Sequence, residues 1–203
     1  MGRLKNHLSL PFHIFYIYVK HHENVPTIIK KELYYLKRLK RSDYIQSADK
    51  LAPWLLGKII CRKTENGILR YRITETECYL GEDDTACHAR CGKTKRNAPM
   101  YLPGGHLYVY LCYGIHSLIN IVSGEENFPE AVLIRGVEGA DGPGKVSKKL
   151  SVNTSYSGLD LCQSNEIWLE DDGYIPNYRT DVRVGIDYAN EQDRQRLWRF
   201  IVI

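Results

Sequence analysis

Strand-like segments joined by turns of hairpin length constrain this chain more than any other feature of its sequence. Residues 58–63 and 69–80 alternate or run apolar, and the polar turn Thr64-Glu-Asn-Gly67 connects them. Residues 106–113 and 117–122 form a second such pair around Tyr113-Gly114. Strands this close in sequence pair antiparallel. The pattern therefore predicts an α+β fold, a single domain with a curved, mostly antiparallel β-sheet flanked by helices.

The remaining segments supply helices and further strands. A helix is expected over 47–57, capped by Ser47 and ended by Gly57, and another over 143–150 after a glycine-rich turn. Acidic residues at the start of 83–90 favour a short helix there. Later strands are expected over 131–137, 167–170 and 182–186.

Charge divides the chain at about residue 42. Residues 1–41 contain nine Lys and Arg against two Glu, whereas residues 42–203 contain 19 Lys and Arg against 22 acidic residues. We therefore expect a basic N-terminal extension over 1–41, to which no function is assigned, and a globular domain over 42–203. Because the body is mildly acidic, any nucleic-acid partner must be argued from local patches and not from the net charge of +4.

The extension contains two segments with more than one interpretation. Apolar residues 8–19 follow Arg3 and Lys5, as in a signal peptide, but no small-residue cleavage site follows. We expect a non-targeting extension, with secretion or a later translation start as alternatives. Residues 27–41 predict a basic amphipathic helix that packs on its own domain, the alternatives being a membrane surface or DNA. No run reaches the roughly 18 apolar residues of a membrane helix, so we expect no membrane partner.

The six cysteines are too few for a disulfide scaffold, which favours reduced thiols in the cytoplasm. The tightest group is Cys87-His88-Ala-Arg-Cys91, with Cys78 upstream. A zinc site would need a fourth ligand at suitable spacing, and none stands out. We therefore expect no metal and no cofactor.

Two carboxylates in Ile73-Thr-Glu-Thr-Glu-Cys-Tyr79 are the first candidates for chemistry. Strand alternation places Glu75, Glu77 and Tyr79 on one face, together with Ile73. The face is either a solvent-exposed edge with paired acids, or a partly apolar pocket that raises a carboxylate pKa into the range of a general base. His88, one short element later, is within folding reach of Glu77, although such a histidine is commonly structural.

A basic loop and a tyrosine-rich hairpin follow. Four positive charges occur in residues 90–96, either as a solvated loop or as a phosphate-binding loop. Alternation places Tyr108 and Tyr110 on one strand face, and Gly114 places Tyr113 at the tip of a tight turn. Proteins that act on bases within duplexes use stacking rings and an inserted side chain. The polar Asn120 and Arg135, in otherwise apolar strands, need partners such as a phosphate or Glu77.

These segments resemble the alkyladenine (3-methyladenine) DNA glycosylase family. The matching text is LAPWLLGKII, ITETECYLGEDDTACHARCGKTKRN, GGHLYVYLCYGIHSLIN, AVLIRG, GPGKV and VRVGI, which covers most of residues 48–187. The resemblance implies a monofunctional DNA glycosylase of base excision repair. Such an enzyme flips damaged purines (3-methyladenine, 7-methylguanine or hypoxanthine) out of double-stranded DNA and hydrolyses the N-glycosidic bond.

The resemblance also implies a role for each matching residue. Glu77 activates the attacking water, Arg135 lies near that water and the target phosphate, and a backbone carbonyl at Val184 holds the water. The flipped base is enclosed by Tyr79, Ala86, His88, Tyr110 and Asn120. DNA is contacted by the wedge Tyr113 and by Lys93, Arg96 and Lys145.

The expected partner is double-stranded DNA with damaged purines, bound by a monomer in the cytoplasm, or at the nucleoid in a bacterium. One alternative is a catalytically weak relative that only binds damaged DNA. Another is an RNA-binding module on the same sheet. The chain departs from the family at 136–142, which is shorter than the family's segment, and at Gly136, where the family usually has alanine.

Overall fold

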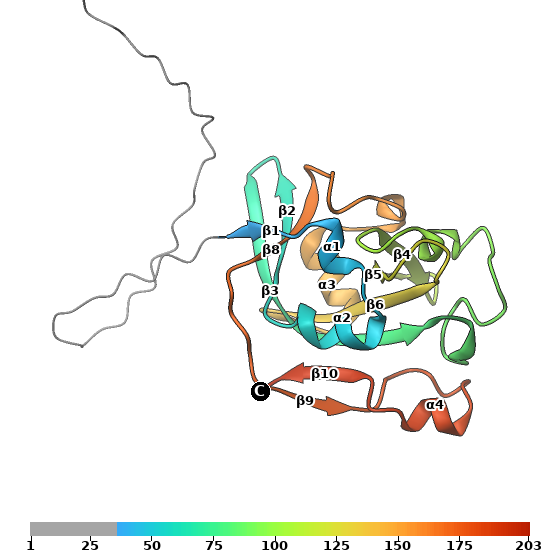
Figure 1. The fold of residues 1–203 in the computed structure, drawn as a ribbon. Coiled ribbons are helices and arrows are strands. Elements are labelled where there is room, and N and C mark those ends of the chain that lie inside the picture. The colour runs from blue at the N-terminus through green and yellow to red at the C-terminus, as the bar shows by residue number, and fades with distance from the viewer. Residues whose placement is uncertain (1–35) are drawn as a thin grey trace, which may run out of the picture.

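The computed structural model describes residues 36–203, and the strands of this part of the chain form one antiparallel sheet (Figure 1). They are β1 (Lys37–Arg38), β2 (Ile59–Thr64), β3 (Gly67–Leu80), β4 (Leu107–Cys112), β5 (His116–Ser123), β6 (Glu130–Val137), β7 (Ala140–Asp141), β8 (Ile167–Asp171), β9 (Tyr178–Asp181) and β10 (Arg199–Val202). The main path runs β1-β8-β2-β3-β6-β5-β4, with β10 beside β3, β9 beside β10 and β7 beside β6.

Short helices complete the fold and confirm the α+β class. They are α1 (Arg41–Tyr44), α2 (Ala48–Leu55), α3 (Pro143–Leu150) and α4 (Glu191–Gln195), together with the 3₁₀ turns η1 (Gly81–Asp83), η2 (Ala98–Tyr101) and η3 (Thr154–Tyr156). The helices α2 and α3 match the segments expected from the sequence. Ser47 stands at the N-cap position of α2, but the expected side-chain cap is absent because its hydroxyl bonds to Asp49.

The long strand β3 connects the two halves of the sheet. Its first half, up to Arg72, pairs with β2, while its second half pairs with β6 on one edge and β10 on the other. The turns at 64–67 and 113–115 join β2 to β3 and β4 to β5, as the sequence predicts. The second half of β3 is therefore the strand from which side chains can meet those of several neighbours.

Strand alternation separates a core face from a second face. On the core face, α2 and α3 pack against the sheet, and the buried residues include Cys78, Ile121, Val132 and Ile134. Thr76 belongs to the same face, since its hydroxyl donates to the carbonyl of Ala52 in α2 at 2.9 Å. The residues between these positions point to the opposite face. Tyr79, Tyr108 and Tyr110 therefore project, with Glu77, away from the main core, as alternation predicts.

Alternation fails at the start of this segment. Ile73 lies in the main core, although strict alternation would place it on the face of Glu77. Register shifts between β3 and β6 occur on both sides of Glu75. A residue inserted into one strand moves the following side chains to the other face. The prediction that Ile73 shares a face with Glu77 is therefore wrong.

The helix predicted over 27–41 is wrong in its described part. Lys37 and Arg38 form β1, which pairs with β8, and Leu39 is buried in the core. The open backbone edge of β8 gives these residues strand hydrogen bonds, which override a helical pattern in a short segment. Residues 27–35 and the apolar run 8–19 lie outside the described residues. The domain boundary at 42 stays a prediction.

Two other predicted elements are also wrong. Residues 83–90 contain the last residue of η1 and then a series of turns in place of a helix, because the Asp84 carboxylate accepts bonds from the amides of Leu80 and Ala86. Residues 182–186 form an irregular loop in place of a strand. There the Arg183 side chain turns inward, and the amide of Val184 bonds to a side chain and not to a neighbouring strand.

Within residues 36–203, no helix is long and apolar enough to cross a membrane.

Candidate active site

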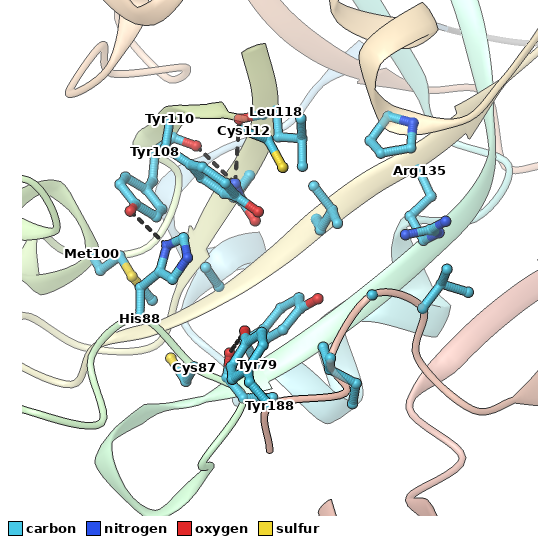
Figure 2. A pocket seen from close by; sticks show the side chains of 18 of the residues that line it. Tyr79, Cys87, His88, Met100, Tyr108, Tyr110, Cys112, Leu118, Arg135 and Tyr188 are labelled. Carbon is cyan, nitrogen blue, oxygen red and sulfur yellow. Dashed lines mark hydrogen bonds between the residues drawn. The ribbon is translucent and has the colours of Figure 1, made fainter. Parts of the chain in front are cut away.

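A cavity of about 190 Å³ lies on the sheet face opposite the main core (Figure 2). It is smaller than the pockets of about 300–1,000 Å³ that hold drug-sized ligands, so it suits one ring system of nucleobase size. Strands β3 to β6 and the loops beside them supply its lining. The predicted site residues that line it are Tyr79, Ala86, His88, Tyr110, Tyr113, Asn120, Arg135 and Val184.

Glu77 lies directly behind the cavity wall, and its side chain has no exposed surface. Its Oε1 accepts a hydrogen bond from the Val184 amide at 2.9 Å and lies 3.3 Å from Arg135 Nη1. Its Oε2 accepts from the Tyr79 hydroxyl at 2.9 Å. Burial raises the Glu77 pKa above 4.5, while Arg135, the Val184 amide and Tyr79 oppose that rise. The result is a buried carboxylate whose oxygens are bonded to three residues of the cavity wall.

Arg135 connects Glu77 to the second carboxylate of the segment. Its Nε donates to Glu75 Oε1 at 3.1 Å, and the same oxygen accepts from Arg199 Nε at 2.6 Å. Arg135 lies at the register shift of β6, opposite the interval between Glu75 and Thr76. The sequence left a phosphate or Glu77 as the expected partner of Arg135, and the structure brings Arg135 and Glu77 together. The sequence did not indicate Arg199, which comes from the C-terminal strand β10.

Aromatic rings form two sides of the cavity. In Figure 2, His88, Tyr108 and Tyr110 lie on one side and Tyr79 and Tyr188 on the other. The His88 and Tyr110 rings meet edge to face with centroids 4.5 Å apart, and His88 Nδ1 lies 2.9 Å from the Tyr108 hydroxyl. Burial lowers the His88 pKa to about 4 and raises that of Tyr108 to about 12. Both side chains are therefore neutral at physiological pH.

Two predicted pocket residues have partners that the sequence did not indicate. The Ala86 carbonyl accepts from the Tyr188 hydroxyl at 2.8 Å. Asn120 is buried, and its Nδ2 donates to the Tyr108 carbonyl at 3.0 Å, so the expected partner, a phosphate or Glu77, is not what holds this side chain. Val184 contacts Glu77 through its amide, whereas the resemblance implied a role for its carbonyl.

Tyr113 is the most exposed aromatic residue among those described. It is 90 % exposed and has φ 50° at the tip of the turn between β4 and β5. Positive φ is uncommon outside glycine and marks a constrained turn. Its ring packs against little else, yet it stands at the edge of the cavity.

The three predicted phosphate contacts lie outside the cavity lining. Arg96 stacks over the Tyr110 ring, with its guanidinium carbon 5.4 Å from the ring centroid. Lys93 Nζ lies 5.1 Å from the centroid of Tyr101. Lys145 is exposed in the first turn of α3. Arg96 therefore contacts the Tyr110 ring without lining the cavity itself.

Sequence reasoning missed an ion pair behind the cavity. Arg183 and Asp84 are both buried and bond to each other at 2.5 and 2.9 Å. The Arg183 guanidinium also lies 4.9 Å from the centroids of Tyr79 and Trp198. The charges of Arg183 and Asp84 did not indicate that the two residues are buried, because a charged residue is usually exposed. Among residues 36–203, no group of three or more His, Cys, Asp or Glu could hold a metal ion.

Comparison with known proteins identifies the family to which the chain belongs. The methylpurine-DNA glycosylase family profile matches residues 42–141 and 138–203. The two segments meet at 138–141, in the stretch that the sequence identifies as short. Three relatives carry the name "Putative 3-methyladenine DNA glycosylase".

These relatives come from different organisms and align over most of their length. The protein of Borreliella afzelii is 39 % identical over 172 residues, which is 78 % of this chain and 92 % of the relative. The protein of Methanocella arvoryzae is 38 % identical over 182 residues, which is 80 % of this chain and 90 % of the relative. The protein of Rickettsia felis is 39 % identical over 171 residues, which is 81 % of this chain and 92 % of the relative. The chain therefore belongs to the methylpurine-DNA glycosylase family and is a DNA glycosylase, a DNA-repair hydrolase that acts on N-glycosyl bonds.

Proposed function

We propose that this glycosylase removes alkylated or deaminated purines from duplex DNA, using Glu77 to activate the attacking water. The candidate substrates are 3-methyladenine, 7-methylguanine and hypoxanthine. The observation that carries the proposal is the position of Glu77, a buried carboxylate bonded to Val184, Arg135 and Tyr79 behind an aromatic cavity.

Cleavage of a glycosidic bond passes through an oxocarbenium-like state. A carboxylate beside the sugar stabilises that positive charge and orients water for attack. Glu77 has no exposed surface, so the proposed reaction requires water to approach it from the cavity side, past the three wall residues that bond to it. A raised pKa suits a general base, because proton transfer is most efficient when the pKa approaches the working pH.

The aromatic walls favour an alkylated base. Alkylation makes several purines cationic, and a cation over a tyrosine face gains about 0.5–2 kcal/mol. His88 is neutral at physiological pH, since its pKa is about 4, and therefore does not repel such a base. Tyr79 and Tyr110 also remain neutral, because burial raises both pKa values above 10.0.

DNA contact follows from the residues around the cavity. Tyr113, exposed at the turn tip, is the wedge that fills the space left by a flipped base. Lys93, Arg96 and Lys145 would neutralise backbone phosphates.

The test is single-turnover release of free base from duplexes that each contain one lesion. Release of at least one of the three purines, with none from undamaged DNA, is the expected result. Tight binding to damaged duplex without release would overturn the proposal in favour of a protein that only binds damage. Stronger competition by single-stranded RNA than by damaged duplex would favour an RNA-binding role.

A further inference from the structure

The ion pair between Arg183 and Asp84 is the most completely buried one in the described part of the chain. The side chains are 0 % and 1 % exposed, and the two bonds between them are 2.5 and 2.9 Å long. Replacing a buried ion pair by apolar residues often costs no stability. Stability alone therefore does not account for this pair, and its position in the fold needs another explanation.

The pair joins the three segments that form one side of the cavity. Arg183 Nη1 donates to the carbonyl of Cys78 in β3 at 3.0 Å. Asp84 accepts from the Ala86 amide at 3.0 Å and the Leu80 amide at 3.3 Å. The third segment is the 182–188 loop, to which Arg183 itself belongs. A shift of this one pair would therefore move β3, the loop of Ala86 and the loop of Val184 relative to one another.

Arg183 also supports the rear face of a cavity wall. Its guanidinium carbon lies 4.9 Å from the Tyr79 centroid and 4.9 Å from that of Trp198. A planar guanidinium can stack on a ring while it forms two parallel bonds to a carboxylate, which a lysine ammonium cannot do. Tyr79 is the ring whose hydroxyl donates to Glu77.

The residue after Arg183 completes the connection to Glu77. The Val184 amide donates to Glu77 Oε1 at 2.9 Å, and that amide lies one peptide bond from the buried arginine. We propose that Arg183, fixed by Asp84, is a positioning residue that holds the Tyr79 ring and the Val184 amide against the Glu77 carboxylate. This inference rests on the proposed role of Glu77 as the general base.

The test compares Arg183→Lys with a matched control variant, Arg72→Lys in β3. Arg72 also forms two bonds to a carboxylate, at 3.1 and 2.7 Å to Asp172, and stacks on Tyr174 at 4.7 Å. It lies outside the cavity lining, so Arg72→Lys disturbs a pair with the same bonding pattern, 24 % and 15 % exposed, without touching the site. Single-turnover excision is measured across pH, each variant at the same interval below its own Tm.

Arg183→Lys should lower the excision rate at neutral pH by about tenfold or more. It should also move the acid limb of the rate profile upward by about one pH unit, because the Val184 amide lowers the Glu77 pKa and would be held less well. Arg72→Lys should do neither. The charged and titratable groups that face Glu77 are Glu75, Tyr79, Tyr110, Arg135, Arg183 and Arg199, of which only Arg183 is changed.

A second measurement reports the geometry without catalysis. The amide resonance of Val184 in a ¹H–¹⁵N spectrum should move upfield in Arg183→Lys and stay in place in Arg72→Lys. If Arg183→Lys does not fold, Asp84→Asn applies the same test from the other partner and should shift the resonance and the acid limb in the same directions.

The outcomes separate the two proposals. If no lesion is released but the Val184 resonance moves, the proposed function fails, and only the structural part of the inference stands, that Arg183 holds the Val184 amide against Glu77. If lesions are released while the acid limb and the resonance match those of the Arg72→Lys control, the positioning role is overturned and the function stands.

Discussion

Replacing Glu77 with glutamine tests the proposed general base directly, because the substitution removes the charge of the side chain and keeps its shape. The Val184 amide can only donate, so the glutamine oxygen must take the place of Oε1, 2.9 Å from that amide. The amide nitrogen then faces the Tyr79 hydroxyl, which can accept as well as donate. The cavity wall therefore keeps its bonds while the general base is lost.

The expected loss is large in rate and small in stability. A positioned general base contributes roughly 10²–10⁴-fold, which is about 3–5 kcal/mol of activation free energy at about 1.36 kcal/mol per tenfold. The variant loses the attraction between Glu77 and Arg135, which are 3.3 Å apart, and this destabilises the folded state. It also no longer has to bury a charge, which offsets part of that loss. Arg135 keeps its bond to Glu75 at 3.1 Å. We therefore expect the free energy of unfolding to change by only about 1–2 kcal/mol.

Glu75→Gln is the matched control. Glu75 lies two residues away and bonds to the same arginine, but it has no contact with Val184 or Tyr79 among its bonds in residues 36–203. Single-turnover release of 3-methyladenine and affinity for the damaged duplex are measured for both variants. Glu77→Gln should bind and fail to cleave, whereas Glu75→Gln should lose far less activity. If Glu77→Gln stays within about tenfold of the original rate, or if both variants are equally inactive, Glu77 is not the base.

Three further substitutions and the pH dependence of excision test the residues around Glu77. Tyr113→Ala should weaken binding to a duplex with an abasic-site analogue by roughly tenfold, because about 1–3 kcal/mol of stacking is lost; unchanged anisotropy titrations would refute the wedge. Excision should fall as the pH drops through the Glu77 pKa, which lies above 4.5, since only the carboxylate is a base. Arg135→Gln should move that acid limb to higher pH, because the nearest positive charge favours the carboxylate; a limb that stays in place in rate–pH profiles would contradict this. Gly136→Ala should lower the free energy of unfolding by about 1–3 kcal/mol, because its Cβ would lie 2.9 Å from Thr74 Oγ1 and 3.0 Å from Glu75 Cβ; unchanged denaturant midpoints would exclude that clash.

Local patterns predicted much of the fold because they depend on neighbours in the chain. The helix α3 has the bounds that its sequence indicates, and the turn of Tyr113 lies where Gly114 predicts it. Strand alternation also placed Glu77 and Tyr79 on one face, where their side chains bond to each other. A period of two follows from backbone geometry and needs no tertiary contact.

Patterns failed where a distant partner decided the conformation. Asp84 reads as a residue in the first turn of a helix, but Arg183, 99 positions away in sequence, holds its carboxylate where the Leu80 and Ala86 amides bond to it. The 182–186 segment reads as a strand, but its Val184 amide bonds to Glu77, 107 positions away. Pairing across such separations leaves no local periodicity to detect.

The sequence alone determined the antiparallel sheet and the tyrosine-rich face, and its resemblance to the family singled out Glu77 as the candidate base. Only the tertiary structure decided how that carboxylate is held, because its partners come from β6 and from the C-terminal loop. It also decided that Arg183 lies behind Tyr79 and that Tyr188 bonds to Ala86. Side-chain periodicity is a property of the chain, whereas the burial and pairing of charges depend on which segments the fold brings together.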